Sequence, residues 1–332
     1  MTNRILELYS GIGGMHCAWG ESGLPGEIAA AVDINPVANE VYSHNFPDTV
    51  LFNRNIQSLS LNHINKLKVN TILMSPPCQP FTRNGKCLDD NDPRTNSFIY
   101  LIGILDQLEN VQYILMENVK GFESSTVRNM FIEKLLQCQF EYQELLLTPS
   151  TVGVPNSRLR YYCIARRCSS TWNFKRKEEI MTSLPDKYGT PYCLEEILDK
   201  DVSETYLVPD KYLRHGNLLD ICYKDSKRSC CFTKAYSHYI EGTGSVYTDT
   251  TPEKVQEQSE LANSYEVGSI EFVAALRELK LRFFTPKEVL RLMSFPICYT
   301  FPENTSIKQC YRLLGNSVNV KVISELLKIL FE

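Results

Sequence analysis

Four short apolar runs in the first half of the chain share one pattern, in which a polar group or a turn follows the last apolar residue. The runs lie at 4–10, 28–32, 71–75 and 113–116. Short apolar runs, spaced widely enough for a crossover helix, are typical of parallel strands buried on both faces. The pattern therefore predicts an α/β fold with a parallel sheet.

The residues that follow these runs carry most of the chemistry of this half. Gly11, Asp33, Cys78 and Glu117 each lie at or just beyond the end of one run. Ligands of open α/β sheets bind outside the carboxyl ends of the strands. We therefore expect these four groups to gather at one edge of the sheet.

The pattern changes in the second half. A helix is predicted over 126–138 and a further strand over 161–165, and residues 181–283 are polar and irregular, with several turn signals. Helical patterning returns at a capping box of Thr285 and Glu288, and a last helix is expected from about Val318. We expect two domains: a catalytic one over 1–180 and 284–332, and a smaller one over 181–283.

Composition narrows the class of protein. The 332 residues are 43% apolar and include 12 cysteines, 35 basic and 39 acidic residues, for a net charge of −4. This apolar content excludes disorder, and no apolar stretch is long enough to span a membrane. We expect an intracellular protein, in the cytoplasm and also in the nucleus, with reduced thiols, no membrane contact and no metal site.

The turn after the first run predicts a ligand site. Gly11, Gly13 and Gly14 let the backbone approach a ligand at a helix N-terminus, although His16 departs from the dinucleotide fingerprint. Asp33 ends the next strand and suits the two hydroxyls of a ribose. The pair favours a nucleoside cofactor, with a structural turn or a dehydrogenase as alternatives.

A cysteine bracketed by prolines follows the third run. Pro76, Pro77 and Pro80 fix the backbone around Cys78 and remove donors from it. Most cysteines are small buried apolar residues, but a core cysteine has no need of a stiff loop. The segment favours Cys78 as a nucleophile, because a thiolate attacks readily and can leave again.

An acid and two arginines complete the candidate site. Glu117 follows an apolar strand, so we expect its pKa to be raised, which would let it donate a hydrogen bond; a helix-capping or loop-bracing acid is the alternative. Arg158 and Arg160 could supply fixed cations, although arginine pairs are more often surface ion pairs.

Six segments in this order resemble the cytosine carbon-5 methyltransferases, which use S-adenosylmethionine. They are Ser10-Gly11-Ile12-Gly13-Gly14, Asp33, Pro76-Pro77-Cys78-Gln79-Pro80-Phe81, Glu117-Asn118-Val119, Arg158-Leu159-Arg160 and Gly315-Asn316-Ser317-Val318. The resemblance implies a Rossmann-like sheet with helices on both faces plus a smaller target-recognition domain. It also implies that residues from about 284 onward rejoin the catalytic domain.

A further segment narrows the resemblance. Cys231-Phe232-Thr233, followed by Ala235-Tyr236, looks like the hallmark of a small eukaryotic branch whose members methylate cytosine 38 in the anticodon loop of aspartate tRNA. Two positions depart from the family pattern, Asn55 in place of an acid and Asn156 in place of a glutamine. We expect cofactor binding to survive, because an asparagine still accepts a hydrogen bond.

The resemblance assigns a role to each residue. Cys78 would add to carbon 6 of cytosine, Glu117 would hydrogen-bond ring nitrogen 3, and Arg158 and Arg160 would position the ring. S-adenosylmethionine, leaving as S-adenosylhomocysteine, would contact a set of backbone turns and strand ends: Ser10, Gly11, Ile12, Gly13, Gly14, Asp33, Ile34, Asn55, Ile56, Ser75, Pro77, Asn316, Ser317 and Val318. The RNA would contact Arg83, Lys86, Arg94, Lys120, Cys231, Phe232, Thr233 and Arg312.

The loop after Cys78 and the local charge bear on the substrate. Residues 82–97 are hydrophilic, and we interpret them as a lid over a flipped base, with an ordinary surface loop as the alternative. Six basic residues face two acidic ones between 211 and 234, a weakly basic patch on an acidic protein. This charge pattern favours selective recognition of one folded RNA. We also expect the protein to be a monomer.

Three other functions remain open from the sequence. The first is the same methyl transfer to DNA, with weak DNA binding, since the catalytic segments do not distinguish an RNA substrate from a DNA substrate. A catalytically silent RNA-binding homologue is the second, although intact Cys78 and Glu117 speak against it. A nicotinamide oxidoreductase is the third and leaves the proline-bracketed thiol unexplained.

Overall fold

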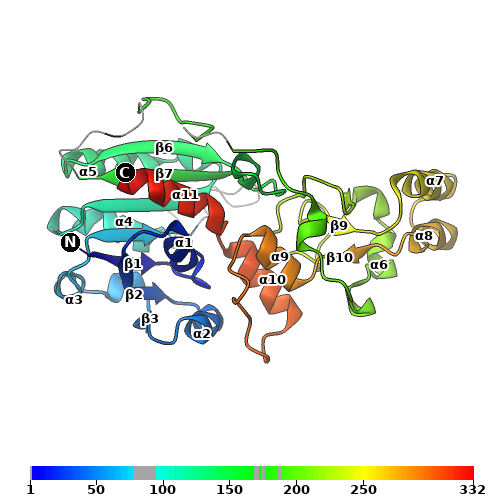
Figure 1. The fold of residues 1–332 in the computed structure, drawn as a ribbon, viewed down its shortest axis with the longest axis horizontal. Helices are drawn as coiled ribbons and strands as arrows, with labels where there is room; N and C mark the ends of the chain where they lie inside the picture. Colours follow the sequence, from blue (N-terminus) through cyan, green and yellow to red (C-terminus); the bar gives the residue numbers. More distant parts are fainter. Residues whose placement is uncertain (1, 78–94, 109, 168–171, 173–175, 185–187) are drawn as a thin grey trace. The chain divides into compact units, whose positions relative to one another are not determined.

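The computed structural model describes residues 2–77, 95–108, 110–167, 172, 176–184 and 188–332 (Figure 1). Within them the contacts divide the chain into two compact units. The first unit is Met1–Thr151, Leu159–Lys187 and Val318–Glu332, and the second unit is Val152–Arg158 and Tyr188–Ser317.

The first unit is built on a seven-stranded sheet with the order β3-β2-β1-β4-β5-β7-β6. Its strands are β1 (Asn3–Leu8), β2 (Gly26–Asp33), β3 (Leu51–Asn53), β4 (Thr71–Met74), β5 (Tyr113–Val119), β6 (Glu141–Leu147) and β7 (Arg160–Arg166). The first five are parallel, and β7 runs antiparallel to both β5 and β6.

The register of the parallel strands brings their carboxyl ends level. Leu8 pairs with Val32 on one side and with Met74 on the other, and Met74 pairs with Met116. The residues after these four positions therefore emerge at one edge of the sheet, as the apolar runs predict.

Helices cover both faces of this sheet. They are α1 (Gly14–Ser22), α2 (Pro36–Asn45), α3 (Leu61–Lys66), α4 (Asn96–Ile104), α5 (Thr126–Gln137) and α11 (Val320–Phe331). Leu6 and Leu8 of β1 pack into one core with Phe98 of α4 and Phe131 of α5. Glu7, between them, points to the opposite face, because side chains alternate along a strand.

The last helix closes that opposite face. Phe331 of α11 packs its ring edge-on against Trp19 of α1 and also contacts the ring of Tyr113 on β5. Figure 1 shows α11 beside α1 in front of the sheet. The prediction of a Rossmann-like α/β fold with helices on both faces is confirmed for this unit.

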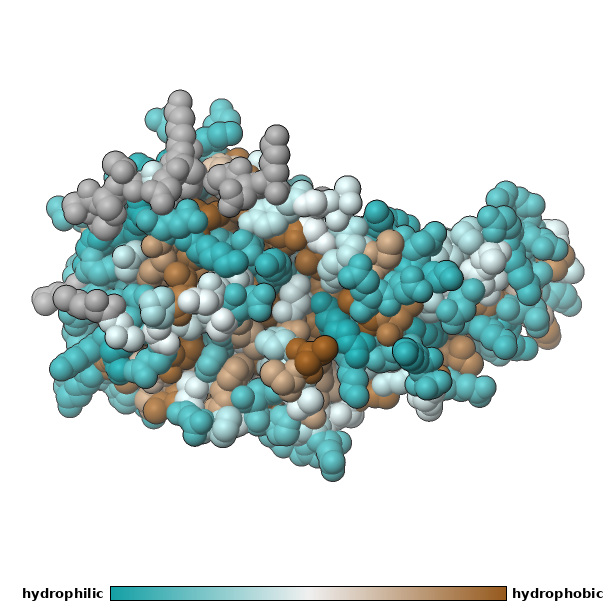
Figure 2. All heavy atoms as spheres, in the orientation of Figure 1, coloured by the Kyte–Doolittle hydropathy of each residue, from teal (hydrophilic) through white to brown (hydrophobic). Residues whose placement is uncertain are grey.

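The second unit is mostly irregular, with a small three-stranded sheet in the order β10-β9-β8. Its elements are α6 (Asp210–Leu213), β8 (Ile221–Cys222), β9 (Val246–Tyr247), α7 (Pro252–Asn263), α8 (Ile270–Arg277), β10 (Arg282–Phe283), α9 (Pro286–Leu292) and α10 (Ile307–Asn316). The surface over α7 and α8 is largely hydrophilic (Figure 2), which is typical of a solvated helix pair.

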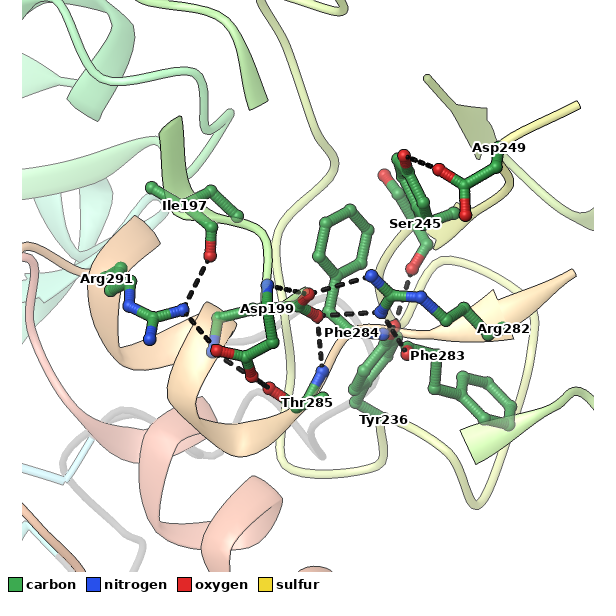
Figure 3. A network of polar contacts seen from close by, with 12 residues as sticks. Ile197, Asp199, Tyr236, Ser245, Asp249, Arg282, Phe283, Phe284, Thr285 and Arg291 are labelled. Atoms are coloured by element: carbon green, nitrogen blue, oxygen red, sulfur yellow. Dashed lines mark hydrogen bonds and ion pairs between the residues drawn. The ribbon is translucent and has the colours of Figure 1, made fainter. Parts of the chain in front are cut away.

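A network of charged side chains around the buried Glu288 organises this unit (Figure 3). Glu288, fully buried on α9, accepts two hydrogen bonds of 2.8 Å from Arg282 and one of 2.7 Å from the backbone N–H of Thr285. Asp199 accepts 2.7 Å bonds from the Thr285 hydroxyl and from Arg291. The predicted capping box is therefore present and also joins β10 to the loop at Asp199.

The unit boundaries differ from those expected for the domains. Residues 284–317, which we expected to rejoin the catalytic domain, group with the second unit, and only the chain from Val318 groups with the first. One reason is that the Phe284 N–H donates a 2.8 Å hydrogen bond to the Tyr236 hydroxyl, which lies in the expected small domain. Among the described residues, no helix has the length and apolar character needed to cross a membrane.

Candidate active site

The glycine turn after β1 has a conformation that few residues other than glycine adopt. Gly11 and Gly13 have φ angles of 52° and 81°. A Cβ atom on Gly13 would lie 2.4 Å from Cε2 of Phe46, so an alanine at this position would have to displace that ring in addition to straining the backbone. The turn therefore leaves its backbone free of side chains, as an approach by a ligand requires.

Asp33 joins this turn to the end of β2. Its Oδ2 accepts a 2.8 Å hydrogen bond from the Gly11 N–H, and its Oδ1 accepts a 2.7 Å bond from the Asn35 N–H. Burial raises the pKa of Asp33, although these backbone bonds oppose the shift. The next residue, Ile34, is 65% exposed and places apolar surface beside the acid. An acceptor for hydroxyls and an apolar patch thus flank the glycine turn.

A buried hydrogen-bonded group lies behind the turn, and sequence reasoning gave it no role. The Tyr42 hydroxyl donates a 2.9 Å bond to Oε2 of Glu7 and lies 2.8 Å from Nδ1 of His16. The His16 ring in turn stacks on Phe46 at 3.7 Å. Burial raises the pKa of Glu7 to about 8 and lowers that of His16 to about 4. Spacing alone offers no signal for this group, because its members come from β1, α1 and α2.

The segment that leads to Cys78 is anchored at two points. The Ser75 hydroxyl donates a 3.1 Å bond to the Tyr9 carbonyl beside the glycine turn. The Asn118 side chain donates a 3.4 Å bond to the carbonyl of Pro76. The described part of this segment ends at Pro77. The predicted nucleophile Cys78 lies outside the described residues, as do Arg83, Lys86 and Arg94.

The acid and one arginine meet across two strands. Because β5 and β7 are antiparallel, Val119 pairs with Arg160 and Glu117 pairs with Tyr162. Nε of Arg160 lies 3.3 Å from Oε1 of Glu117, and both side chains are largely buried. Asn118, between Glu117 and Val119, makes the contact to Pro76, so one strand end carries both the ion pair and the anchor of the proline segment.

The other arginine, Arg158, binds backbone carbonyls of the second unit. Arg158, 4% exposed, donates to the carbonyls of Phe232 at 3.2 Å, Gly315 at 3.1 Å and Ser317. These partners all belong to the second unit. Backbone carbonyls therefore engage the Arg158 guanidinium, and the positioning of a ring by both arginines stays a prediction.

The Cys231–Thr233 segment is also more buried than a surface for RNA would be. Phe232 is 2% exposed, and its ring packs edge-on against Tyr236 at 4.8 Å and Phe284 at 5.4 Å. The ring is a core side chain of the second unit, and the contact of Phe232 with RNA stays a prediction. Cys231 and Thr233 are half-buried.

The remaining predicted residues lie at turns and helix ends. The Asn55 Oδ1 accepts a 3.0 Å bond from the Gln57 N–H and so caps a short helical turn, while Ile56 is buried in the core. Lys120, Arg312 and Asn316 are exposed, and Val318 is buried. Within the described part of the chain, no cluster of three or more metal-ligating side chains has the geometry to hold an ion.

Comparisons with known proteins place the chain in one family. The family model of C-5 cytosine-specific DNA methylases matches residues 3–332. A tRNA (cytosine(38)-C(5))-methyltransferase of Spodoptera frugiperda is 71% identical over the whole of both chains. The mouse protein of the same name is 43% identical, over 99% of this chain and 93% of its own. The crystal structure of a mutant of Spodoptera frugiperda DNMT2 superposes with a TM-score of 0.94 at 70% identity, covering all of both chains.

Glu7 makes the stability of the first unit depend on pH. In the folded protein the pKa of Glu7 is about 8, whereas the pKa of an ordinary glutamate is 4.5. The folded state therefore binds more protons between these values, and stability falls as pH rises through them. Relative to Glu7→Gln, which stays neutral, we expect the wild type to lose up to about 4 kcal/mol between pH 5 and pH 8.

Urea unfolding of both proteins at four pH values in this range measures the difference. Glu21→Gln, on the exposed surface of α1, is the matched control and should track the wild type at every pH. A difference between wild type and Glu7→Gln that stays constant with pH would contradict the assignment.

Proposed function

Because the chain belongs to the C-5 cytosine-specific DNA methylase family, we propose that it methylates carbon 5 of cytosine 38 in the anticodon loop of a tRNA, with aspartate tRNA as the substrate. The observation that carries the proposal is the 71% identity, over the full length of both chains, to a protein named for that reaction. The ion pair of Glu117 and Arg160 at the end of β5 supports it.

Cytosine carbon 5 is a poor nucleophile, and the chain's own residues supply the electrons it needs. The Cys78 thiolate adds to carbon 6, and Glu117 hydrogen-bonds ring nitrogen 3 through a proton taken up when cytosine binds, while charge develops on the ring. Arg160 holds the Glu117 carboxyl group and offsets negative charge on the ring. After carbon 5 has been methylated, its proton leaves to a water molecule, and the electron pair of that C–H bond expels Cys78.

The glycine turn suits S-adenosylmethionine as the methyl donor. When bound, this cofactor supplies the electrophilic methyl group. The bare backbone of Gly11 and Gly13 would lie against it, Asp33 would accept from its ribose hydroxyls, and Ile34 would cover an apolar face of its base. Asn316, Ser317 and Val318 join the proposed cofactor residues on the family resemblance.

A loop of RNA is a favourable substrate for this chemistry on energetic grounds. The reacting atoms are inaccessible inside a stacked helix, so the cytosine must be turned out of its stack, which costs least in a loop. The surface charge agrees with a nucleic-acid partner. Six basic residues between 211 and 234 are all exposed: Lys211, Arg214, Lys224, Lys227, Arg228 and Lys234. We propose that they contact phosphates in the cytoplasm, where tRNA is abundant.

A methyl-transfer assay tests the substrate and the nucleophile together. Wild type with labelled S-adenosylmethionine should label total tRNA and an aspartate-tRNA anticodon stem–loop. It should not label the same stem–loop with uridine at position 38, or duplex DNA. Cys78→Ala should transfer no methyl group while it still binds S-adenosylhomocysteine, because only the nucleophile is lost. Label in DNA alone would overturn the substrate, and turnover by Cys78→Ala would overturn the mechanism.

A matched pair of glycine substitutions tests the cofactor site. In Gly13→Ala the new Cβ would lie 2.4 Å from Phe46, and the backbone has φ 81°, so the turn must shift. In Gly20→Ala, within the same α1 helix, the Cβ meets no atom within 4 Å. Calorimetric titration with S-adenosylhomocysteine should show at least a tenfold weaker Kd for Gly13→Ala and an unchanged Kd for Gly20→Ala. Equal affinities would place the cofactor elsewhere.

A further inference from the structure

Three segments that are far apart in the sequence meet at one buried guanidinium in the second unit. Nη1 of Arg158 donates to the carbonyl of Phe232 at 3.2 Å and lies 3.5 Å from Sγ of Cys231. Nη2 donates to the carbonyls of Gly315, at 3.1 Å, and Ser317. A charged donor fixed by backbone carbonyls holds main chain rather than side chains, so the contact is insensitive to the residues that present those carbonyls.

Two of these segments also touch each other directly. A Cβ atom on Gly315 would lie 2.1 Å from the backbone nitrogen of Lys234 and 2.3 Å from the carbonyl carbon of Thr233. Both contacts are with backbone, which cannot rotate away as a side chain can. The Gly315–Ser317 turn therefore packs directly against the Thr233–Lys234 backbone, and only glycine fits at position 315.

The two residues before Arg158 are hydrogen-bonded to the chain that leads into the Cys231–Lys234 segment. The Asn156 side chain donates 3.0 Å bonds to Oγ of Ser229 and to the carbonyl of Cys230. The Ser157 N–H donates a 2.9 Å bond to the carbonyl of Ser229. The chain before Arg158 thus runs along the segment that leads to Phe232, which aims the guanidinium at the turn.

The chain connectivity gives this contact its importance. Arg158 is followed directly by Leu159 and Arg160, where the chain enters the first unit, and Ser317 is followed by Val318, where it enters that unit again. One side chain therefore ties together two of the points at which the chain leaves the second unit. Arg160 carries the ion pair to Glu117, and Asn316 and Ser317 are proposed cofactor residues.

We propose that Arg158 is a positioning residue, which fixes the Gly315–Ser317 turn on the Cys231–Lys234 segment and thereby sets the cofactor affinity of the enzyme. The assignment of the effect to the cofactor rests on the proposed function. The Cys231-Phe232-Thr233 segment then supports this turn by packing against it, which is a role distinct from RNA contact. A lysine cannot replace Arg158, because one ammonium group lacks the planar fork that reaches separate carbonyls.

The experiment compares two conservative substitutions of buried arginines in the same unit. Arg158→Lys removes the contact to the turn, and Arg282→Lys removes the paired bonds to Glu288 without touching the turn. Two quantities are measured: the Kd for S-adenosylhomocysteine by calorimetry, and amide hydrogen exchange by mass spectrometry. Thermal unfolding identifies the temperature at which all three proteins are folded.

For Arg158→Lys we expect at least a tenfold weaker Kd and faster exchange in peptides over 231–234 and 315–317 together. For Arg282→Lys we expect a lower Tm, a Kd within twofold of wild type and unchanged exchange at those two segments. Methyl transfer lost by Arg158→Lys with an unchanged Kd would overturn the proposal and make Arg158 a catalytic residue. Unchanged exchange at the two segments would overturn it as well.

Two further outcomes are kept distinct. If the wild type bound no S-adenosylhomocysteine, the proposed function would fail, and the exchange measurement alone would decide whether Arg158 holds the turn. If Arg158→Lys did not fold, Asn156→Ala would replace it, since it removes the side-chain bonds to Ser229 and Cys230 and leaves Arg158 itself in place. Exchange at 315–317 should then rise by a smaller factor, and no rise would contradict the proposal.

Discussion

The ion pair between Glu117 and Arg160 is the contact on which the candidate site depends. It exists because β7 runs antiparallel to β5, so that the first residue of one strand pairs with the last residue of the other. The same strand end carries Asn118, which binds the carbonyl of Pro76 two residues before Cys78. The sheet thereby fixes an acid, a cation and the approach to the thiol at one edge.

Much of this edge could be predicted from the sequence. Short apolar runs ending in Gly11, Asp33 and Glu117 indicate strands buried on both faces, and parallel strands in register put such residues side by side. The observed β2 and β4 end within one residue of the predicted runs, whereas β1 ends two residues earlier and β5 three residues later. Local chemistry was equally informative at Thr285, whose capping box is present as predicted.

The two arginines show where such reasoning stops. The sequence led us to expect Arg158 and Arg160 as two fixed cations at one site. Side chains two residues apart share a face only within a strand. The strand begins only at Arg160, however, and alternation has no meaning for the irregular chain before it. The core packing of Phe232 and the buried group of Glu7, Tyr42 and His16 were not predicted for a related reason, because their partners come from elements distant in the sequence.

The central claim is that Cys78 attacks cytosine 38 of a tRNA beside Glu117 and Arg160. An anticodon stem–loop with 5-fluorocytidine at that position tests it most directly, because fluorine cannot leave carbon 5 as a proton does, and the adduct at carbon 6 persists. With S-adenosylmethionine present, mass spectrometry should find one protein–RNA adduct, carrying one methyl group and mapped to Cys78, at a much lower yield for Arg160→Ala. No adduct, or an adduct on another cysteine, would contradict the account.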